Sequence, residues 1–370
     1  MKLAVLLVAS LLLPLFGADT GTERAMEVVE RAVEEGAFPG AVALIGKGNR
    51  VAAQEAYGHA MLVPEVREMR EDTLFDLASL TKPIATATSV MILIDRGIMR
   101  LDDPAVLFIP EFGRNGKESI TIRELLTHTS GLPASEPFYL SCSSYDEVIS
   151  AVCNVSLEYS PGEEYLYSDL GYMILGEIVR MVSGERLDVF ARENIFGPLG
   201  MRNTTFNPQS KERCAATELC PWRGGVIVGE VHDENAYAMG GASGHAGLFS
   251  TASDLFTFAQ MMLNGGQYRG KRILSTGAVR AMTREQTHGK GDYGFGWMMK
   301  SDTYSSGGDL LSESSYGHTG FTGTSIWIDP EAELVVILLT NRVHPTRDNN
   351  AHIRVRALFA NAAVASLASQ

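Results

Sequence analysis

Residues 41–58 read AVALIGKGNRVAAQEAYG and predict a β-hairpin near the start of the chain. Two segments with strand-like patterns, Ala41–Gly46 and Arg50–Gly58, flank the tripeptide Lys47-Gly48-Asn49. A short glycine-containing connection of this kind is typical of a turn between antiparallel strands. The preceding segment Thr22–Gly36 places apolar side chains at helical spacing, so a helix is expected before the hairpin.

The rest of the chain has a long helical middle followed by a second group of strands. The predicted helices are Ser79–Arg96, Ile122–Thr127, Tyr145–Val152, Leu170–Val182, Leu187–Ile195, Ser253–Leu263 and Asn349–Ser366. The predicted later strands are Tyr293–Lys300, Ser315–Thr319, Thr324–Ile328 and Glu333–Thr340. This order predicts an α/β fold with one antiparallel sheet built from both termini and flanked by helices, and with an inserted, mostly helical lobe. We expect the α/β lobe at about residues 19–74 and 286–370, and the helical lobe at about 75–285.

Composition limits the function classes. The chain has 370 residues, of which 45% are hydrophobic and 20% charged, enough for one large core or two lobes. These values exclude a disordered chain, a collagen-like fibre and a small disulfide-stapled domain. With 31 Lys and Arg against 44 Asp and Glu, the net charge is −13, and no basic stripe is present. We therefore expect no binding to nucleic acid, which needs clustered cations. As a separate expectation, the protein is a monomer.

The N-terminus has the pattern of a secretory signal peptide. Lys2 is followed by the apolar run Leu3–Phe16 and by the small residues Gly17 and Ala18. This run is shorter than the roughly 20 apolar residues of a membrane span. A buried N-terminal strand or helix is the alternative. We expect residues 1–18 to be removed and the mature domain, residues 19–370, to be periplasmic or secreted with no integral membrane span.

Four cysteines are consistent with an exported protein. An even number in an oxidising compartment favours two disulfides, and we prefer the local pairings Cys142–Cys153 and Cys214–Cys220. The alternative is four free thiols. A zinc site is disfavoured because neither pair has Cys-x-x-Cys spacing.

Residues 75–82, FDLASLTK, contain a candidate nucleophile and base. Ser79 lies where a helix is expected to begin, and Lys82 follows one turn later on the same face. A serine hydroxyl becomes a good nucleophile when a neighbouring base removes its proton. The first N–H groups of a helix can also stabilise an oxyanion. A capping serine followed by an exposed lysine is the structural alternative.

Two later segments add polar groups of the same kind. Tyr167 and Asp169 come just before a predicted helix, and a phenol near a cationic lysine can transfer protons. In the predicted strand Tyr316–Phe321, Gly320 leaves space for close backbone approach, and Phe321 could supply a second oxyanion donor.

The order of these motifs resembles class C β-lactamases and D-Ala-D-Ala peptidases, and related esterases and D-amino-acid amidases. Their pattern is Ser-x-x-Lys, then Tyr-x-Asn, then Lys-Thr-Gly. Further matching segments are 120–133 (ITIRELLTHTSGLP), Pro161–Tyr172, 196–201 (FGPLGM) and Gly240–Leu255, and the resemblance covers about residues 25–365. It implies a β-lactamase/transpeptidase-like fold and a cofactor-free serine hydrolase that forms an acyl-enzyme. Ser79 would be the nucleophile, Lys82 its base and Tyr167 a proton shuttle, with the amides of Ser79 and Phe321 forming the oxyanion hole.

Two residues depart from the family pattern. Asp169 replaces the usual Asn, and a carboxylate there would keep Lys82 charged and transfer more of the base role to Tyr167. His318 replaces the usual Lys before Thr319 and Gly320, which leaves weaker attraction for a substrate carboxylate. All four positions, Asp169 and His318 to Gly320, correspond to substrate-binding positions. Strong β-lactam hydrolysis is therefore not expected.

A narrower resemblance points to a branch that recycles cell-wall fragments. It rests on residues 229–236, 244–247 and 340–347, and a Bacillus member of that branch cleaves the bond between N-acetylmuramic acid and the stem peptide. We expect a small-molecule or muropeptide substrate whose carboxylates meet Arg342 or Arg347; structural ion pairs are the alternative for both arginines. Other candidate functions are a carboxylesterase, a D-Ala-D-Ala carboxypeptidase, a weak β-lactamase and an inactive wall-binding relative.

A metal site is not expected. The segment His232-Asp233-Glu234 and the later His245 offer ligand-type side chains. They lack the His-Glu-x-x-His pattern of a zinc-binding helix. Hydrogen bonding within turns and loops is the expected role of these residues.

Overall fold

The computed structural model describes residues 21–301 and 305–367. The predicted signal peptide, residues 1–18, lies outside the described residues. Within the described part of the chain, no helix combines the length and the apolar character that crossing a membrane requires.

A seven-stranded antiparallel sheet is built from both ends of the chain. Its order is β11 (Met298–Met299), β12 (Tyr316–Thr319), β13 (Ser325–Asp329), β14 (Leu334–Thr340), β1 (Gly40–Lys47), β2 (Arg50–Met61) and β3 (Arg67–Glu68). The predicted hairpin forms β1 and β2, and β1 also pairs with β14, Ala41 lying opposite Thr340. The predicted fold class is therefore confirmed.

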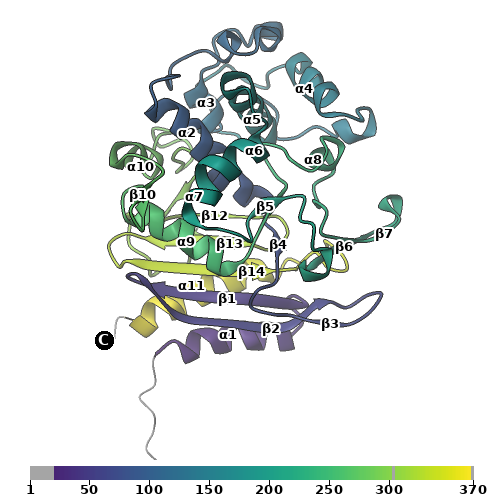
Figure 1. Ribbon diagram of the computed structural model, residues 1–370, viewed down its shortest axis with the longest axis vertical. Coiled ribbons are helices and arrows are strands. Elements are labelled where there is room, and N and C mark those ends of the chain that lie inside the picture. The colour runs from purple at the N-terminus through teal and green to yellow at the C-terminus, as the bar shows by residue number, and fades with distance from the viewer. Residues whose placement is uncertain (1–20, 302–304, 368–370) are drawn as a thin grey trace, which may run out of the picture.

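Helices cover both faces of this sheet. Helices α1 (Glu23–Glu34) and α11 (His352–Leu367) pack together on one face, and α9 (Ala252–Leu263) packs on the other (Figure 1). Successive residues of a strand point to opposite faces. Accordingly, Ile45 belongs to a smaller core with α1 and α11, whereas Leu44 belongs to the large core beneath the helical part.

The helical middle of the chain lies on the α9 side of the sheet (Figure 1). Its helices are α2 (Thr88–Asp95), α3 (Ile122–Leu126), α4 (Tyr145–Asn154), α5 (Asp169–Ser183), α6 (Leu187–Ala191), α7 (Gly197–Leu199), α8 (Glu234–Ala238) and α10 (Thr276–Met282). Small sheets add β4 (Phe75–Asp76), β5 (Thr205–Phe206), β6 (Ala216–Cys220), β7 (Gly225–Val228), β8 (Leu248–Ser250), β9 (Gln267–Tyr268) and β10 (Lys271–Arg272). The predicted helix Ser79–Arg96 is divided into a 3₁₀ turn at Ala78–Leu80, a π-helix at Lys82–Ala87, and α2.

Two predicted boundaries differ from the structure. The strand expected at Tyr293–Lys300 is reduced to β11, because Gly296 adopts a φ of +85° and turns the chain between Tyr293 and Met298. The last helix begins at His352 instead of Asn349, because the Asn349 side chain accepts a hydrogen bond (3.0 Å) from a backbone N–H two residues later and forms a turn.

The predicted disulfides are wrong, because all four cysteines are free thiols. Cys142 precedes the N-terminus of α4 and Cys153 lies near its other end, and a ten-residue helix is about 15 Å long. Cys214 and Cys220 are separated by the extended strand β6, which advances about 3.3 Å per residue. A disulfide needs Cα atoms within about 7 Å, so both pairs are held too far apart.

Candidate active site

Ser79 lies in a sharp turn between β4 and the π-helix. Ala78, directly before it, has a φ of +47°, a left-handed conformation that costs about 1–2 kcal/mol for a residue with a Cβ. The Asp76 carboxylate supports this turn by accepting from the Ala78 N–H (2.9 Å) and from the His232 N–H (2.6 Å). The turn places Ser79 at the wall of two adjoining cavities.

Lys82 is completely buried beneath Ser79. Its Nζ donates to the Ser79 Oγ (3.0 Å) and to the His245 carbonyl (3.2 Å), and it pairs with Asp169 Oδ1 (2.6 Å). Burial alone lowers the pKa of Lys82, but the Asp169 carboxylate and the Tyr167 phenol outweigh it and raise that pKa above its ordinary value. Lys82 is therefore an ammonium ion in the resting site, as the Asp169 substitution predicted.

Tyr167 completes the group around the hydroxyl. Ser168 caps α5, and Tyr167 lies in the turn just before that cap. Its ring centroid is 4.8 Å from the Lys82 Nζ, and its phenol hydrogen-bonds to the side chains of Lys82 and Ser79. Burial raises the pKa of Tyr167, although the Lys82 ammonium opposes this, so the phenol is protonated. The structure thus brings together Ser79, Lys82 and Tyr167, the residues predicted as nucleophile, base and proton shuttle.

His128 supports Tyr167 from below. Its ring centroid lies 4.4 Å from that of Tyr167, its Nδ1 accepts from the Ser168 N–H (3.0 Å), and its carbonyl accepts from the Leu166 N–H (2.9 Å). Burial, together with the nearby charge of Lys82, holds the pKa of His128 well below its usual range. A neutral imidazole therefore fixes both the ring and the backbone of the Tyr167 segment.

His318 on β12 is a buried neutral residue instead of a cation. Its Nδ1 donates to the Thr319 carbonyl (2.8 Å), which leaves Nε2 to accept from the Tyr293 hydroxyl (2.7 Å). Burial, with the charge of Lys82, lowers the pKa of His318 to about 3. Thus His318 lines the cavity wall together with Thr319, but both of its nitrogens already have partners within the protein.

The loop after β12 joins Phe321 to the segment before Ser79. A Cβ on Gly320 would collide with the Leu77 carbonyl oxygen, so only glycine permits this approach. The Thr324 hydroxyl donates to the same Leu77 oxygen (3.0 Å). Among the described residues, no carbonyl accepts from the Phe321 N–H. This amide is consequently available as the predicted oxyanion donor beside Ser79.

The two predicted arginines have different environments. Arg347 forms ion pairs with Glu218 and with Glu234, the latter at 2.7 Å, so its charge is balanced by structural partners. Arg342 is buried and donates from Nε to the Phe321 carbonyl (2.7 Å) and from Nη1 to the Arg347 carbonyl (2.8 Å). Its guanidinium lies over the Phe321 ring at 4.3 Å. No carboxylate pairs with Arg342 among the described residues, and Arg342 lines the cavity that contains Ser79 and Phe321.

Asp233 and the buried His245 form a further pair that the sequence did not assign to the site. Asp233 Oδ1 accepts from His245 Nε2 (2.8 Å), and both residues line the same cavity as Ser79 and Asp169. Burial raises the pKa of Asp233, but His245 and the Ala236 N–H reverse this and hold it below its usual value. Ligand-type atoms of Asp169, Asp233 and His245 lie within 4.8 Å of one another.

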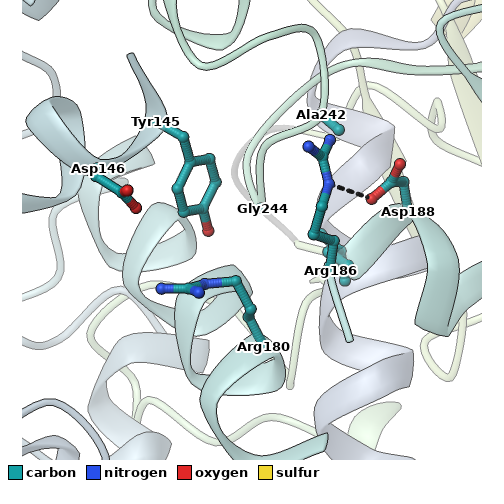
Figure 2. Close-up of a pocket in the computed structure, with 8 residues that line it drawn as sticks. Tyr145, Asp146, Arg180, Arg186, Asp188, Ala242 and Gly244 are labelled. Atoms are coloured by element: carbon teal, nitrogen blue, oxygen red, sulfur yellow. Dashed lines mark hydrogen bonds and ion pairs between the residues drawn. The ribbon is translucent and has the colours of Figure 1, made fainter. Parts of the chain in front are cut away.

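A third cavity, of about 220 Å³, is lined by Tyr145, Arg180, Arg186 and Gly244 among others (Figure 2). Gly244 lines this cavity, whereas the next residue, His245, lines the one containing Ser79. Its two arginines have partners within the protein: Arg186 pairs with Asp188 (3.0 Å), and Arg180 with Glu177 (2.6 Å). This cavity is therefore separate from the site described above.

Comparison with known proteins agrees with this geometry. The family model for Beta-lactamase matches residues 26–361. A putative D-alanyl-D-alanine carboxypeptidase of Escherichia coli O157:H7 is 36% identical, with 85% of this chain and 81% of that protein covered. N-acetylmuramyl-L-alanine amidase of Bacillus subtilis is 35% identical, with 86% and 80% covered. A penicillin-binding protein homolog from Caulobacter crescentus has the same fold, with a TM-score of 0.75, 21% identity, and 94% and 97% covered.

Proposed function

Because the chain belongs to the beta-lactamase family of serine hydrolases, we propose that it is an exported amidase that releases the stem peptide from muramyl peptides. The bond broken would join the lactyl carbonyl of N-acetylmuramic acid to the first amino group of the peptide. Ser79 would attack that carbonyl and hold the acyl group until water releases it. The muramyl amidase of Bacillus subtilis, 35% identical, supports this choice of bond.

The single observation that carries the proposal is the unpaired cation beside the oxyanion donor. The hydrogen bonds of Arg342 go to neutral oxygens, those of Phe321, Arg347, Asn349 and Asn350. Its Nη2 has no partner among the described residues, and its side chain lines the cavity that opens at Ser79. A stem peptide carries carboxylates close to the scissile bond, and a guanidinium binds carboxylates strongly.

The proton transfers follow from the charges at rest. Lys82 is held protonated by Asp169, 2.6 Å away, so it becomes a base only after losing one proton to solvent. It can then take the Ser79 proton across 3.0 Å as the hydroxyl oxygen attacks. The amides of Ser79 and Phe321 stabilise the resulting oxyanion. Tyr167, a protonated phenol, donates its proton to the departing amine and is reprotonated by Lys82, so every proton is accounted for.

A D-alanyl-D-alanine carboxypeptidase is the second candidate. Its peptide substrate also ends in a carboxylate that Arg342 could bind, and the related Escherichia coli protein has that name. An esterase has less support, because a simple ester carries no carboxylate for Arg342 to bind. A β-lactamase has less support because His318, a neutral residue here, stands where the family pattern has Lys.

A substrate panel tests the proposal. Purified mature protein is assayed with muramyl dipeptide, a peptide ending in D-Ala-D-Ala, p-nitrophenyl butyrate and nitrocefin, with the Ser79→Ala protein as control. We expect the highest kcat/KM for muramyl dipeptide. Arg342→Met should reduce it about 10- to 100-fold, the value of a charge-assisted hydrogen bond of about 1.5–3 kcal/mol. A carboxamide analogue of the same substrate should be affected much less, and an equal loss on both would contradict the role of Arg342.

Localisation and oligomeric state belong to the same proposal. The sequence of the first 18 residues supports export, and N-terminal sequencing of the protein from a cell envelope or culture supernatant should begin near residue 19. Sedimentation of the mature protein should give a monomer. An intact N-terminus in the cytoplasmic fraction would contradict export.

A further inference from the structure

Three aromatic side chains from separate segments meet outside the catalytic residues. Trp222 lies at the tip of the β6–β7 hairpin, Tyr237 on α8, and Tyr139 in the short 3₁₀ turn Phe138–Leu140. The rings of Trp222 and Tyr139 are stacked, with centroids 5.8 Å apart and planes at 21°, and the Tyr237 ring meets Trp222 edge-on at 6.2 Å. We call these three residues the aromatic platform.

The platform remains open to solvent. Trp222 keeps 56% of its surface exposed and Tyr237 keeps 43%, although each already contacts another ring. The other two tryptophans of the chain, Trp297 and Trp327, are buried at 0% and 3%. Exposed aromatic clusters of this kind mark binding surfaces, since rings that serve only packing are normally covered.

Buried polar contacts hold the platform in a fixed position. The Arg223 guanidinium lies 3.7 Å from the Tyr237 ring centroid, and its Nη1 donates to the Val231 carbonyl (2.7 Å). The Asn235 side chain accepts from the Tyr139 N–H (3.0 Å). The hairpin tip, the 3₁₀ turn and α8 are therefore tied together, and α8 and β6 lie towards the same edge of the molecule (Figure 1). A preorganised surface loses little entropy when a ligand binds.

The platform adjoins a segment that lines the cavity at Ser79. Asp233, at the start of α8, lines that cavity together with Glu234. Arg223, next to Trp222, donates to the Val231 carbonyl (2.7 Å) and to the His232 carbonyl (3.5 Å), and His232 also lines that cavity. The platform therefore lies close to the wall of the cavity.

From this placement we infer that the aromatic platform is a glycan subsite that stacks the pyranose ring of an N-acetylated amino sugar. The inference rests on the proposed function, because in a muramyl peptide the sugar is joined through a short lactyl ether to the carbonyl that Ser79 attacks. Arg342 lies beyond Phe321, in the other cavity at Ser79, so the peptide extends one way and the sugar the other. The flat faces of aromatic rings pack against the C–H groups of a pyranose, and the exposed Glu230 carboxylate beside Arg223 (3.2 Å) can accept from its hydroxyls.

Tryptophan fluorescence tests the subsite without any turnover. Because Trp222 is the exposed tryptophan, quenching by acrylamide reports mainly on it. We expect N-acetylmuramic acid and N-acetylglucosamine to protect wild-type protein from quenching, and the dipeptide L-alanyl-D-isoglutamine to give no protection. Loss of the protectable signal in Trp222→Phe would assign the effect to this ring. Absence of protection by either sugar, or equal protection by the dipeptide, overturns the inference.

Kinetics supply the second measurement. Hydrolysis of N-acetylmuramyl-L-alanyl-D-isoglutamine is compared with that of D-lactyl-L-alanyl-D-isoglutamine, which has the same bond and no sugar. Trp222→Ala should lower the ratio of their kcat/KM values about tenfold, and Trp222→Phe should lower it less. Leu310→Ala, 54% exposed and outside the platform, is the matched control and should leave the ratio unchanged. An unchanged ratio in Trp222→Ala overturns the subsite. If wild-type protein cleaves neither compound, the proposed amidase function fails, and the quenching result still decides the subsite.

Discussion

Replacing Asp169 by Asn tests whether the buried ion pair controls the base. The Lys82 Nζ and Asp169 Oδ1 are 2.6 Å apart. At an effective dielectric constant of about 20, their attraction is about 6 kcal/mol. The Asp169 side chain is 25% exposed, so solvent screening reduces its effect on proton affinity to on the order of 3 kcal/mol, or about two pH units. Without this carboxylate, burial lowers the pKa of Lys82, and the amine becomes neutral at lower pH.

The assay is the pre-steady-state burst of p-nitrophenol from p-nitrophenyl acetate, measured between pH 6 and pH 10. We expect the pH profile of the acylation rate of Asp169→Asn to be shifted to lower pH by about two units relative to that of the wild type. Asp188→Asn is the matched control, because Asp188 is 28% exposed and pairs with Arg186 away from Ser79. Its burst should follow the wild-type profile. An Asp169→Asn profile identical to wild type would refute the reasoning, as would a rate equal to that of Ser79→Ala at every pH.

Three further substitutions have definite expected outcomes. Gly320→Ala drives a Cβ into the Leu77 carbonyl, so thermal unfolding should show a loss of about 1–3 kcal/mol together with a weaker acyl-enzyme burst; wild-type values for both would contradict the close approach. His318 has a folded pKa of about 3, below the unfolded value of about 6.5, so its contribution to stability is complete above pH 6.5 and declines as pH falls towards 3. We therefore measure the free energy of unfolding by urea titration between pH 4.5 and pH 6.5. His318→Gln should reduce the change of this free energy with pH by at most about 1.4 kcal/mol per pH unit. An unchanged dependence on pH would count against a buried neutral imidazole. His245→Ala removes one of the two hydrogen bonds to Asp233 Oδ1, leaving that from the Ala236 N–H. The loss should cost about 1.5–3 kcal/mol in urea titrations at pH 7, while fluorophosphonate labelling continues; unaltered stability would show that the pair contributes little.

Local sequence patterns predicted the hairpin, the fold class and the proximity of Ser79 to Lys82, and the family resemblance added Tyr167 to that group. These predictions succeeded because strand and helix periodicity is a local property, and because the motif spacing reflects a fixed catalytic geometry. The sequence does not show whether Arg347 contacts the substrate or forms a structural ion pair, and the structure pairs it with Glu218. Those residues are 129 positions apart, and only the folded chain brings them together.

The wrong cysteine pairings and the contacts that the sequence did not indicate have a similar origin. The cysteine pairings were inferred from sequence proximity, which does not show that an extended strand separates Cys214 from Cys220. The pairing of Asp233 with His245 depends on how the loop before β8 returns to the N-terminus of α8. The aromatic platform joins three segments, and no motif connects Tyr139 with Trp222. Long-range contacts of this type carry no local signal in a single sequence.

The pairing of Ala41 with Thr340 also governs when the enzyme becomes active during its synthesis. The two strands are 299 positions apart (340 − 41), so the sheet has a high contact order, which slows folding. At roughly 10 residues per second, a ribosome needs about half a minute to extend the chain from one strand to the other. Ser79 is made early, but the oxyanion donor of Phe321 follows only with the last strands. A nascent or truncated chain therefore carries the nucleophile without the means to use it.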